Sequence, residues 1–302
     1  MARVFSALAA AVFALVAIAS ARADGPPEVV FAGYNLEDYF HASDFPDGKE
    51  KVSKSPEAIA AEICVIQDIH PDILGVCEMG PEVEFTSFQA LLKNAGLDFP
   101  YTEYVQGPDP ERHVALLSRY PIVSRQSMTD VPYELDGHEE KVSRGFLDVT
   151  IAVGGTKVRF IGVHLKSKVK DTWEDESELR RNEAHLLREH IDTVLAADPG
   201  TRLVVYGDFN DTKESASLKE IEGTRSGPGA LRDLLLKDAQ GDHWTEYWNY
   251  TDVYSRIDYI MVTHDLLPAV DYQKSYINRS PEWNKASDHR AVVAAFRLEK
   301  AQ

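Results

Sequence analysis

Hydrophobic and polar positions follow two patterns along this chain. Eight short segments are rich in Val, Ile, Leu and Phe, which is typical of β-strands. These segments are Glu28 to Asn35, Asp72 to Glu78, His113 to Ser118, Phe146 to Val153, Lys157 to His164, Thr201 to Asp208, Arg256 to Val262 and Ala291 to Leu298. Several are continuous apolar runs, so we expect strands that are covered on both faces.

A helical period marks four further segments. They are Pro56 to Ile69, Glu84 to Asn94, Glu176 to Leu195 and Ala230 to Leu236. The pair Gly154-Gly155 between two strands predicts a tight hairpin turn. Hairpins and helices alternate irregularly with strands, which indicates one layered α/β domain over about residues 27–299 rather than a barrel of βα repeats.

The first 23 residues differ from the rest of the chain. An apolar run from Val4 to Ile18 follows Arg3 and precedes Ala21-Arg22-Ala23, a pattern typical of a cleavage site. About 15 apolar residues are too few for a bilayer that needs about 20, so we expect a signal peptide over residues 1–23, cut after Ala23. The mature protein would be periplasmic or secreted, with no transmembrane span.

Composition and charge narrow the class of function. The chain has 302 residues, of which 44% are hydrophobic and 27% charged, and this composition is globular. Its formal charge is −17, and loss of the two leader arginines would make it −19. This acidity counts against tight non-specific binding of polyanions but leaves room for a locally positive site.

The two cysteines can be tested for a disulfide by their positions. Cys64 falls in a predicted helix and Cys77 in the strand that follows the His70-Pro71 turn. Counted from that turn, a helix rises about 9 Å and a strand about 20 Å over six residues, so the cysteines would differ in height by about 11 Å. We therefore expect two buried free thiols.

Polar side chains stand at or near the ends of the apolar strands. In the segment from Leu203 to Asp211, period-two alternation places Asp208 and Asn210 on one side and Phe209 on the other. If the strand ends converge, they bring together Asn35, Glu78, His164, Asp208, Asn210, Asp258, Asp288 and His289. Several carboxylates in one pocket repel each other unless a cation compensates them. An oxygen-rich set without cysteine favours Mg²⁺ or Mn²⁺ over Zn²⁺.

Six short motifs occur in one order along the chain. They are YNLEDYF, PDILGVCEMG, GVHLKSK, YGDFND, SRIDYI and SDHR. In this order they resemble the signature of the endonuclease/exonuclease/phosphatase superfamily, which has the deoxyribonuclease-I-like fold. The resemblance implies an α/β (α+β) four-layer sandwich, in which two packed mixed or antiparallel sheets are flanked by helices. It also implies a hydrolase that acts on phosphoester bonds.

The resemblance further implies a metal site. Glu78 is similar to the principal metal ligand of the family, and Asn35 and Asp288 would complete or support the site. The expected cofactor is Mg²⁺ or Mn²⁺. The number of bound ions stays open.

The same resemblance implies the catalytic roles. Asp208 would orient or deprotonate the attacking water, and Asn210 would donate to a phosphate oxygen. His289, held by Asp258, would stabilise the pentacovalent phosphorus or help to transfer a proton. His164 is the candidate general acid.

Other residues are weaker candidates. Lys166 and Arg112 are possible substrate contacts. For a set of aromatic residues, ordinary packing beneath the site is expected rather than stacking on a base or contact with lipid. The set is Trp244, Tyr247, Trp248, Tyr250 and Tyr254.

The sequence thus predicts a metal-dependent phosphoester hydrolase, and in particular a secreted or periplasmic phosphodiesterase or nuclease. Hydrolysis of a phospholipid, as in sphingomyelinases, or of a small phosphate ester is the alternative. A catalytically silent binding module of the same fold is a more distant one. No protein partner is evident, and we expect a monomer.

Overall fold

A computed structural model of the chain describes residues 27–41, 52–169, 175–224 and 227–299. The predicted signal peptide lies outside these residues. No described helix has both the length and the apolar character needed to cross a membrane.

Two six-stranded sheets form the centre of the described structure. The first has the order β15 (Tyr276–Ile277), β16 (Val292–Arg297), β1 (Glu28–Tyr39), β2 (Ile73–Met79), β4 (His113–Ser118) and β3 (Tyr101–Val105). The second has the order β11 (Leu231–Asp233), β14 (Asp258–Thr263), β10 (Leu203–Asp208), β9 (Thr156–His164), β8 (Leu147–Val153) and β5 (Ile122–Arg125). In each sheet one central pair is parallel, β1 with β2 and β10 with β9, and the other described pairs are antiparallel.

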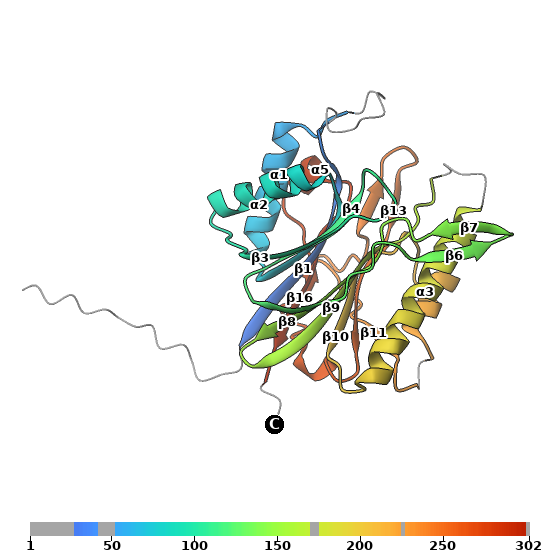
Figure 1. The fold of residues 1–302 in the computed structure, drawn as a ribbon. Coiled ribbons are helices and arrows are strands. Elements are labelled where there is room, and N and C mark those ends of the chain that lie inside the picture. Colours follow the sequence, from blue (N-terminus) through green and yellow to red (C-terminus); the bar gives the residue numbers. More distant parts are fainter. Residues whose placement is uncertain (1–26, 42–51, 170–174, 225–226, 300–302) are drawn as a thin grey trace, which may run out of the picture.

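Helices cover the outer face of each sheet (Figure 1). The first sheet carries α1 (Pro56–Ile69), α2 (Glu82–Asn94) and α5 (Trp283–Ala286), and the second carries α3 (Glu176–Ala197) and α4 (Ala216–Glu222). Separate apolar clusters fill the space between the sheets and the space beneath each helical layer. The predicted four-layer sandwich is confirmed. Two small ribbons lie outside it, β6 (Pro132–Leu135) with β7 (His138–Lys141), and β12 (Glu246–Trp248) with β13 (Val253–Ser255).

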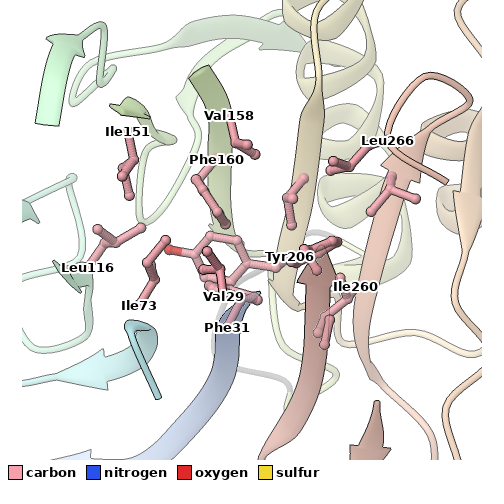
Figure 2. Close-up of a cluster of buried hydrophobic side chains, with 14 of the residues drawn as sticks. Val29, Phe31, Ile73, Leu116, Ile151, Val158, Phe160, Tyr206, Ile260 and Leu266 are labelled. Atoms are coloured by element: carbon pink, nitrogen blue, oxygen red, sulfur yellow. The ribbon is translucent and has the colours of Figure 1, made fainter. Parts of the chain in front are cut away.

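Tyr206 fills the middle of the layer between the sheets (Figure 2). Its ring lies edge-on to Phe31 of the opposite sheet, with 4.7 Å between the ring centroids. A Cβ atom at Gly75 or Gly162 would come within 2.1 or 2.5 Å of Tyr206. Both glycines therefore make room for the tyrosine that packs the two sheets together.

The sequence predictions for the elements hold with one exception. Helix α1 has the predicted bounds, and Gly154 and Gly155 turn the β8–β9 hairpin with φ of 58° and 91°. The helix predicted over Ala230 to Leu236 is wrong, because this segment contains strand β11. Its leucines suit either structure, and pairing with the edge of β14 satisfies the backbone of a segment too short for a stable helix.

Both cysteines are free, as predicted, but only one is buried. Cys64 is exposed, because the buried face of α1 is formed by neighbouring positions such as Ala61 and Val65. The prediction of a buried thiol at Cys64 is therefore wrong. Cys77 is buried, and its Sγ donates to the carbonyl oxygen of Val163, 3.4 Å away on the other sheet.

Candidate active site

The candidate site lies at the edge of the sandwich where the two parallel pairs end. Asn35 lies where the regular pairing of β1 with β2 ends, and Glu78 lies one residue before the end of β2. His164 and Asp208 stand opposite each other at the ends of β9 and β10. A pocket of about 300 Å³ opens at this edge. It is lined by Glu37, Asp38, Glu78, Arg112, Arg144, His164, Ser167, Val169, Asp208, Asn210, Glu246, Trp248, Asp288 and His289.

The predicted alternation after β10 is confirmed. Asp208 and Asn210 line the pocket, whereas Phe209 is completely buried in the cluster beneath α3. Asn210 has a φ of 51°, a conformation that Asn adopts more readily than most residues. Its backbone N–H donates to Oδ1 of Asp208 at 2.8 Å, and its side-chain amide donates to the carbonyl oxygen of Leu165 at 3.0 Å.

The exit of β1 and β2 is also held by the polar side chains that it carries. Glu37, Asp38 and Glu78 have φ of 48°, 54° and 58°, a region that costs about 1–3 kcal/mol for a residue other than glycine. Oδ1 of Asn35 accepts from the backbone N–H of Glu37 at 3.0 Å. Oε2 of Glu78 accepts from that of Asp38 at 2.9 Å. Hydrogen bonds from the strained backbone to the side chains of Asn35 and Glu78 therefore stabilise this edge of the sheet.

Asn35 connects the two sheets within the site. Its Nδ2 donates to Oε1 of Glu78 at 3.1 Å and to Oδ2 of Asp208 at 3.0 Å. Both carboxylate oxygens of Asp208 are thus occupied by donors, since Oδ1 accepts from Asn210. This arrangement fixes the orientation of Asp208 although its side chain is almost fully buried.

His289 comes from the segment before β16 and reaches across to Asp258 on β14. Its Nδ1 lies 2.8 Å from Oδ2 of Asp258. With Nδ1 donating to this carboxylate, Nε2 faces Asp208 and Asp288, each 3.8 Å away. The backbone N–H of His289 donates to Oγ of Ser287 at 3.0 Å, which fixes the start of this segment.

The two histidines of the site have opposite shifts. Burial alone would lower the pKa of His289, but the charge and hydrogen bond of Asp258, followed by Asp208 and Asp288, raise it well above its ordinary value. Burial lowers the pKa of His164 well below its ordinary value, and the positive charges of Arg144 and Arg112 add to this effect. These shifts favour the protonated form of His289 and the neutral form of His164.

The carboxyl groups of the pocket show an excess of negative charge. Burial and then Asp258 raise the pKa of Asp208 to about 8. Burial and Asp288 raise that of Glu37 to about 7, and burial and Glu78 raise that of Asp38 to about 6. Burial is the main cause of these shifts and the neighbouring carboxylates add to it, so a cation in the pocket would favour the ionised forms.

The sequence profile of the Endonuclease/Exonuclease/phosphatase family matches residues 54–289. The chain belongs to this family. Its members hydrolyse phosphoester bonds, and the protein is accordingly a phosphoester hydrolase. Among proteins of curated function, none matches the sequence.

Solved structures of the same fold are similar over most of this endonuclease/exonuclease/phosphatase chain. Sphingomyelinase C from Streptomyces griseocarneus is 16% identical, covers 89% of this chain and 99% of its own, and gives a TM-score of 0.61. The catalytic domain of human nocturnin, with bound sulfate, is 19% identical, covers 90% and 94%, and gives 0.62. An endonuclease/exonuclease/phosphatase from Bacteroides vulgatus is 19% identical, covers 90% and 100%, and gives 0.61. At these identities the likeness concerns the fold.

The family depends on a divalent metal ion, and the donor atoms of the pocket suit one. Glu78, His164 and Asp208 offer ligand atoms that all lie within 4.8 Å of one another. A second such group, Asp208, Asp258 and His289, is a poorer choice, because Asp258 and His289 are already bonded to each other. Asp288, the third residue predicted at the metal, also lines the pocket. The excess negative charge described above fits the same conclusion.

Of the two predicted substrate contacts, one lines the pocket. Arg112 does, although its guanidinium is paired with Asp38 through distances of 2.7 and 2.9 Å. Lys166 does not line the pocket, and its side chain is buried. Its backbone N–H donates to Oε2 of Glu183 at 2.6 Å, which fixes the backbone of Lys166 against α3. The structure therefore gives no support for substrate contact by Lys166.

Sequence reasoning missed several pocket residues. Arg144 lies in a turn and Glu246 at the start of the short strand β12, and neither has an apolar strand pattern that marks its direction. Asp38 lies three residues after the recognised Asn35 on β1. Only the side-by-side position of acidic residues in the first motif could have pointed to Asp38. For Arg144 there was no local signal, because the segment Ser143-Arg144-Gly145 resembles any polar turn.

The aromatic residues near the site are more exposed than expected. Trp244 does pack below the surface, against the guanidinium of Arg290, which lies 3.4 Å from the ring centre. Tyr250 and Tyr254, at the β12–β13 hairpin, are however 85% and 53% exposed. Trp248 lines the pocket itself. The expectation that the whole set packs beneath the site is therefore wrong.

Proposed function

We propose that this protein is an exported, Mg²⁺- or Mn²⁺-dependent phosphodiesterase that hydrolyses nucleic acid by in-line attack of water on phosphorus. The observation that carries the proposal is the placement of Asp208, fixed by two donors, with its Oδ2 3.8 Å from Nε2 of His289 in one pocket. A carboxylate and an imidazolium in one site can serve the two proton transfers that hydrolysis needs.

Asp208 would act on the water. Asn35 and Asn210 orient its carboxylate through hydrogen bonds. In its ionised form, which a bound cation would favour against the raised pKa, Asp208 can accept a proton as the oxygen of water forms its bond to phosphorus. The bond between phosphorus and the leaving oxygen then breaks. The free N–H of the Asn210 amide, beyond the one bonded to Leu165, is available to a phosphate oxygen.

His289 is better suited than His164 to protonate the leaving oxygen. The sequence resemblance assigned this role to His164, but burial lowers the pKa of His164 and so disfavours the protonated form that a general acid needs. Asp258 raises the pKa of His289, stabilises the charge of its protonated form and fixes its ring. His164, with its neutral ring, would instead contribute a ligand or a hydrogen bond.

Glu78, with Asn35 and Asp288 beside it, would hold the divalent ion. When bound, this ion polarises a phosphoryl oxygen and stabilises charge on the leaving group. Glu37 and Asp38 add negative charge next to the same site. No covalent nucleophile is required.

Nucleic acid is the proposed substrate, although the chain is acidic. Trp248 offers an aromatic ring in the pocket, and stacking on such a ring suits any base. The pocket also contains two arginines that can meet a phosphate chain. The predicted leader supports export to the periplasm or the medium.

Hydrolysis of a phospholipid is the second candidate. The exposed Tyr250 and Tyr254 next to the pocket favour it, because tyrosine suits the boundary between lipid and water. Sedimentation with sphingomyelin vesicles at low salt tests this candidate. A Tyr250→Ser/Tyr254→Ser variant should lose binding if the hairpin contacts lipid, and absence of binding by the unaltered protein would remove the candidate.

The deciding experiment is hydrolysis by the purified protein of four substrates, with Mg²⁺ and then with a chelator. These substrates are plasmid DNA, RNA, sphingomyelin vesicles and bis(p-nitrophenyl) phosphate. We expect the nucleic acids and the small diester to be cleaved, and the chelator to stop cleavage. Asp208→Ala and His289→Ala should both be inactive. If both variants keep full activity, the proposed mechanism is wrong.

A further inference from the structure

Two arginines line the pocket, and they differ in how many of their guanidinium nitrogens are paired with carboxylates. Arg112 is paired through two nitrogens with Asp38 and lies 3.7 Å from Glu78. Arg144 makes one ion pair, from Nη2 to Oδ2 of Asp109 at 2.9 Å. Among the described residues, neither Nε nor Nη1 of Arg144 has a hydrogen-bond partner, although the side chain is only 5% exposed.

A buried guanidinium N–H without an acceptor destabilises the folded protein. A bound ligand that accepts a hydrogen bond from these N–H groups would remove this cost. The two free nitrogens belong to a side chain that lines the pocket. Most of the other ionisable residues that line the pocket are acidic. None of the described residues, however, accepts a hydrogen bond from Nε or Nη1 of Arg144. A planar guanidinium with free N–H groups matches the oxygens of a phosphate.

The backbone around Arg144 is held in place from two sides. The backbone N–H of Asp109 donates to the carbonyl oxygen of Ser143 at 2.7 Å. A Cβ atom at Gly107 would come within 2.5 Å of the carbonyl carbon of Arg144, so only glycine allows this close approach. Two chain segments are therefore packed tightly at the base of the arginine.

Glu183 on α3 ties this segment to the strand end that carries His164. One carboxylate oxygen accepts from the backbone N–H of Ser143 at 2.8 Å, and the other from that of Lys166 at 2.6 Å. Arg144 is thus positioned relative to His164 through a buried carboxylate. The positive charge of Arg144 also acts on the ring of His164. After burial, this charge is the largest cause of the lowered pKa of His164.

We propose that Arg144 binds an anionic oxygen of the substrate phosphate and is the main cationic contact of the site. The proposal rests on the proposed function, because it takes the substrate to be a phosphodiester. The oxygen belongs either to the scissile phosphate or to the next phosphate along the chain. Arg112, whose donors face carboxylates, has the smaller share in binding.

A purely structural role for Arg144 makes a different prediction. The arginine would then serve only to neutralise Asp109 and the nearby Glu183. Its replacement would lower the melting temperature but leave the KM for substrate and the affinity for phosphate unchanged.

The test compares Arg144→Met with the unaltered protein and with Arg297→Met. Arg297 is a matched control, because it pairs with Asp271 at 2.6 Å outside the pocket lining. If the oxygen belongs to the scissile phosphate, loss of a charged hydrogen-bond donor should raise the KM for bis(p-nitrophenyl) phosphate by about 10- to 100-fold. The control should leave KM unchanged. Arg144→Lys, which keeps the charge but has fewer directed donors, should give a smaller rise in KM and serves if the methionine variant does not fold.

A binding measurement separates this proposal from the proposed function. Inorganic phosphate should raise the melting temperature of the metal-free protein, and this rise should disappear in Arg144→Met or shrink in Arg144→Lys. If the unaltered protein cleaves no diester, the proposed function fails, while the phosphate effect still decides the role of Arg144. If Arg144→Met and Arg144→Lys both keep normal KM and phosphate binding, the inference is wrong.

Two dinucleotides identify which phosphate is bound. Thymidylyl-thymidine has only the scissile phosphate, and its 5′-phosphorylated form has a second one. An equal rise in KM for both substrates in Arg144→Met places the arginine at the scissile phosphate. A rise confined to the 5′-phosphorylated form places it at the neighbouring phosphate. No rise with either dinucleotide contradicts the proposal.

Discussion

The two sheets contribute to the site in different ways. The sheet of β1 and β2 presents Glu78 and Asp288, whose side chains are 17% and 31% exposed. The sheet of β9 and β10 presents Asp208 and His164, each 2% exposed, and Asp258 behind them. One half thus offers accessible carboxylates, and the other a buried set of groups joined by hydrogen bonds.

From this difference we propose a separate chemical task for each half. Accessible and crowded carboxylates attract a cation from solvent, and they tolerate its exchange. Buried groups with fixed partners have shifted pKa values, which suits proton transfer. His289 belongs with the buried half. It lies in the segment that leads into β16 of the first sheet, but its ring is bonded to Asp258 of the second sheet.

The largest expected effect comes from His289, which tests the proton-transfer half. His289→Gln should lower kcat by about 10²- to 10⁴-fold, the range for loss of a general acid. His190→Gln is the matched control, because His190 also pairs with a buried aspartate, Asp148, at 2.7 Å but lies outside the pocket lining. The control should keep its activity. Equal losses of kcat in the two variants would mean that His289 acts through stability alone.

The next effect concerns Glu78 and the metal half. Removal of the divalent ion should abolish activity, and Glu78→Gln should raise the Mg²⁺ concentration for half-maximal activity by at least the ~100-fold that loss of a partner around a metal can cost. Mg²⁺ should also raise the melting temperature of the unaltered protein but not of Glu78→Gln. Glu103→Gln, on β3 of the same sheet and paired with Arg125, is the control. A normal Mg²⁺ response in Glu78→Gln would place the ion elsewhere.

The pH dependence of metal binding separates the halves further. The pKa of Glu37 is raised from 4.5 to about 7, so this carboxyl is protonated at pH 5.5 and ionised at pH 8. Asp38, with a pKa of about 6, follows the same direction. The affinity for Mg²⁺ should therefore increase with pH, by up to about tenfold per pH unit for each proton released.

Without metal, the sign for stability is the reverse. A carboxyl group whose pKa is raised on folding contributes stability below pH 4.5, and this contribution is lost as the pH rises through about 7. The melting temperature of the metal-free protein should fall over this window, and Mg²⁺ should restore it. Calorimetric titrations at pH 5.5 and 8 check the affinity, and Glu37→Gln should weaken its pH dependence. An affinity independent of pH would contradict the assignment of these acids to the metal half.

Much of the site could be predicted from sequence, because its residues follow apolar strands. Asp208 and Asn210 share a face by period-two alternation, and parallel strands such as β9 and β10 end at the same edge. Most of the candidate metal ligands and catalytic residues could therefore be found by looking at the ends of the predicted strands. The metal and catalytic roles given to them are still predictions.

The misses share a physical cause. Arg144 and Tyr250 belong to loops or hairpins, where no period links a position to a direction in space. Likewise, the leucines around Leu231 suit a helix as well as a strand, and only the neighbouring edge of β14 decided between them. The order of pKa values for His164 and His289 could not be predicted either, since it depends on burial and on charges that are distant in sequence.

The smallest effect concerns the contact between the two halves beneath the site. Cys77 precedes Glu78 on one sheet, and its thiol donates to Val163, which precedes His164 on the other. Cys77→Ala removes this contact and leaves a small void, which should cost about 1 kcal/mol of the free energy of unfolding. Because Cys77 and Val163 directly precede Glu78 and His164 in the sequence, we expect kcat to fall a few-fold while the KM stays constant. Cys64→Ala, at an exposed position of α1, should change stability by less than about 0.5 kcal/mol and leave kcat unchanged. Denaturant unfolding and steady-state kinetics of the two variants measure both quantities. If Cys77→Ala loses stability but keeps full kcat, the two halves hold their relative position without this thiol, and Asn35 is then the main connection between them.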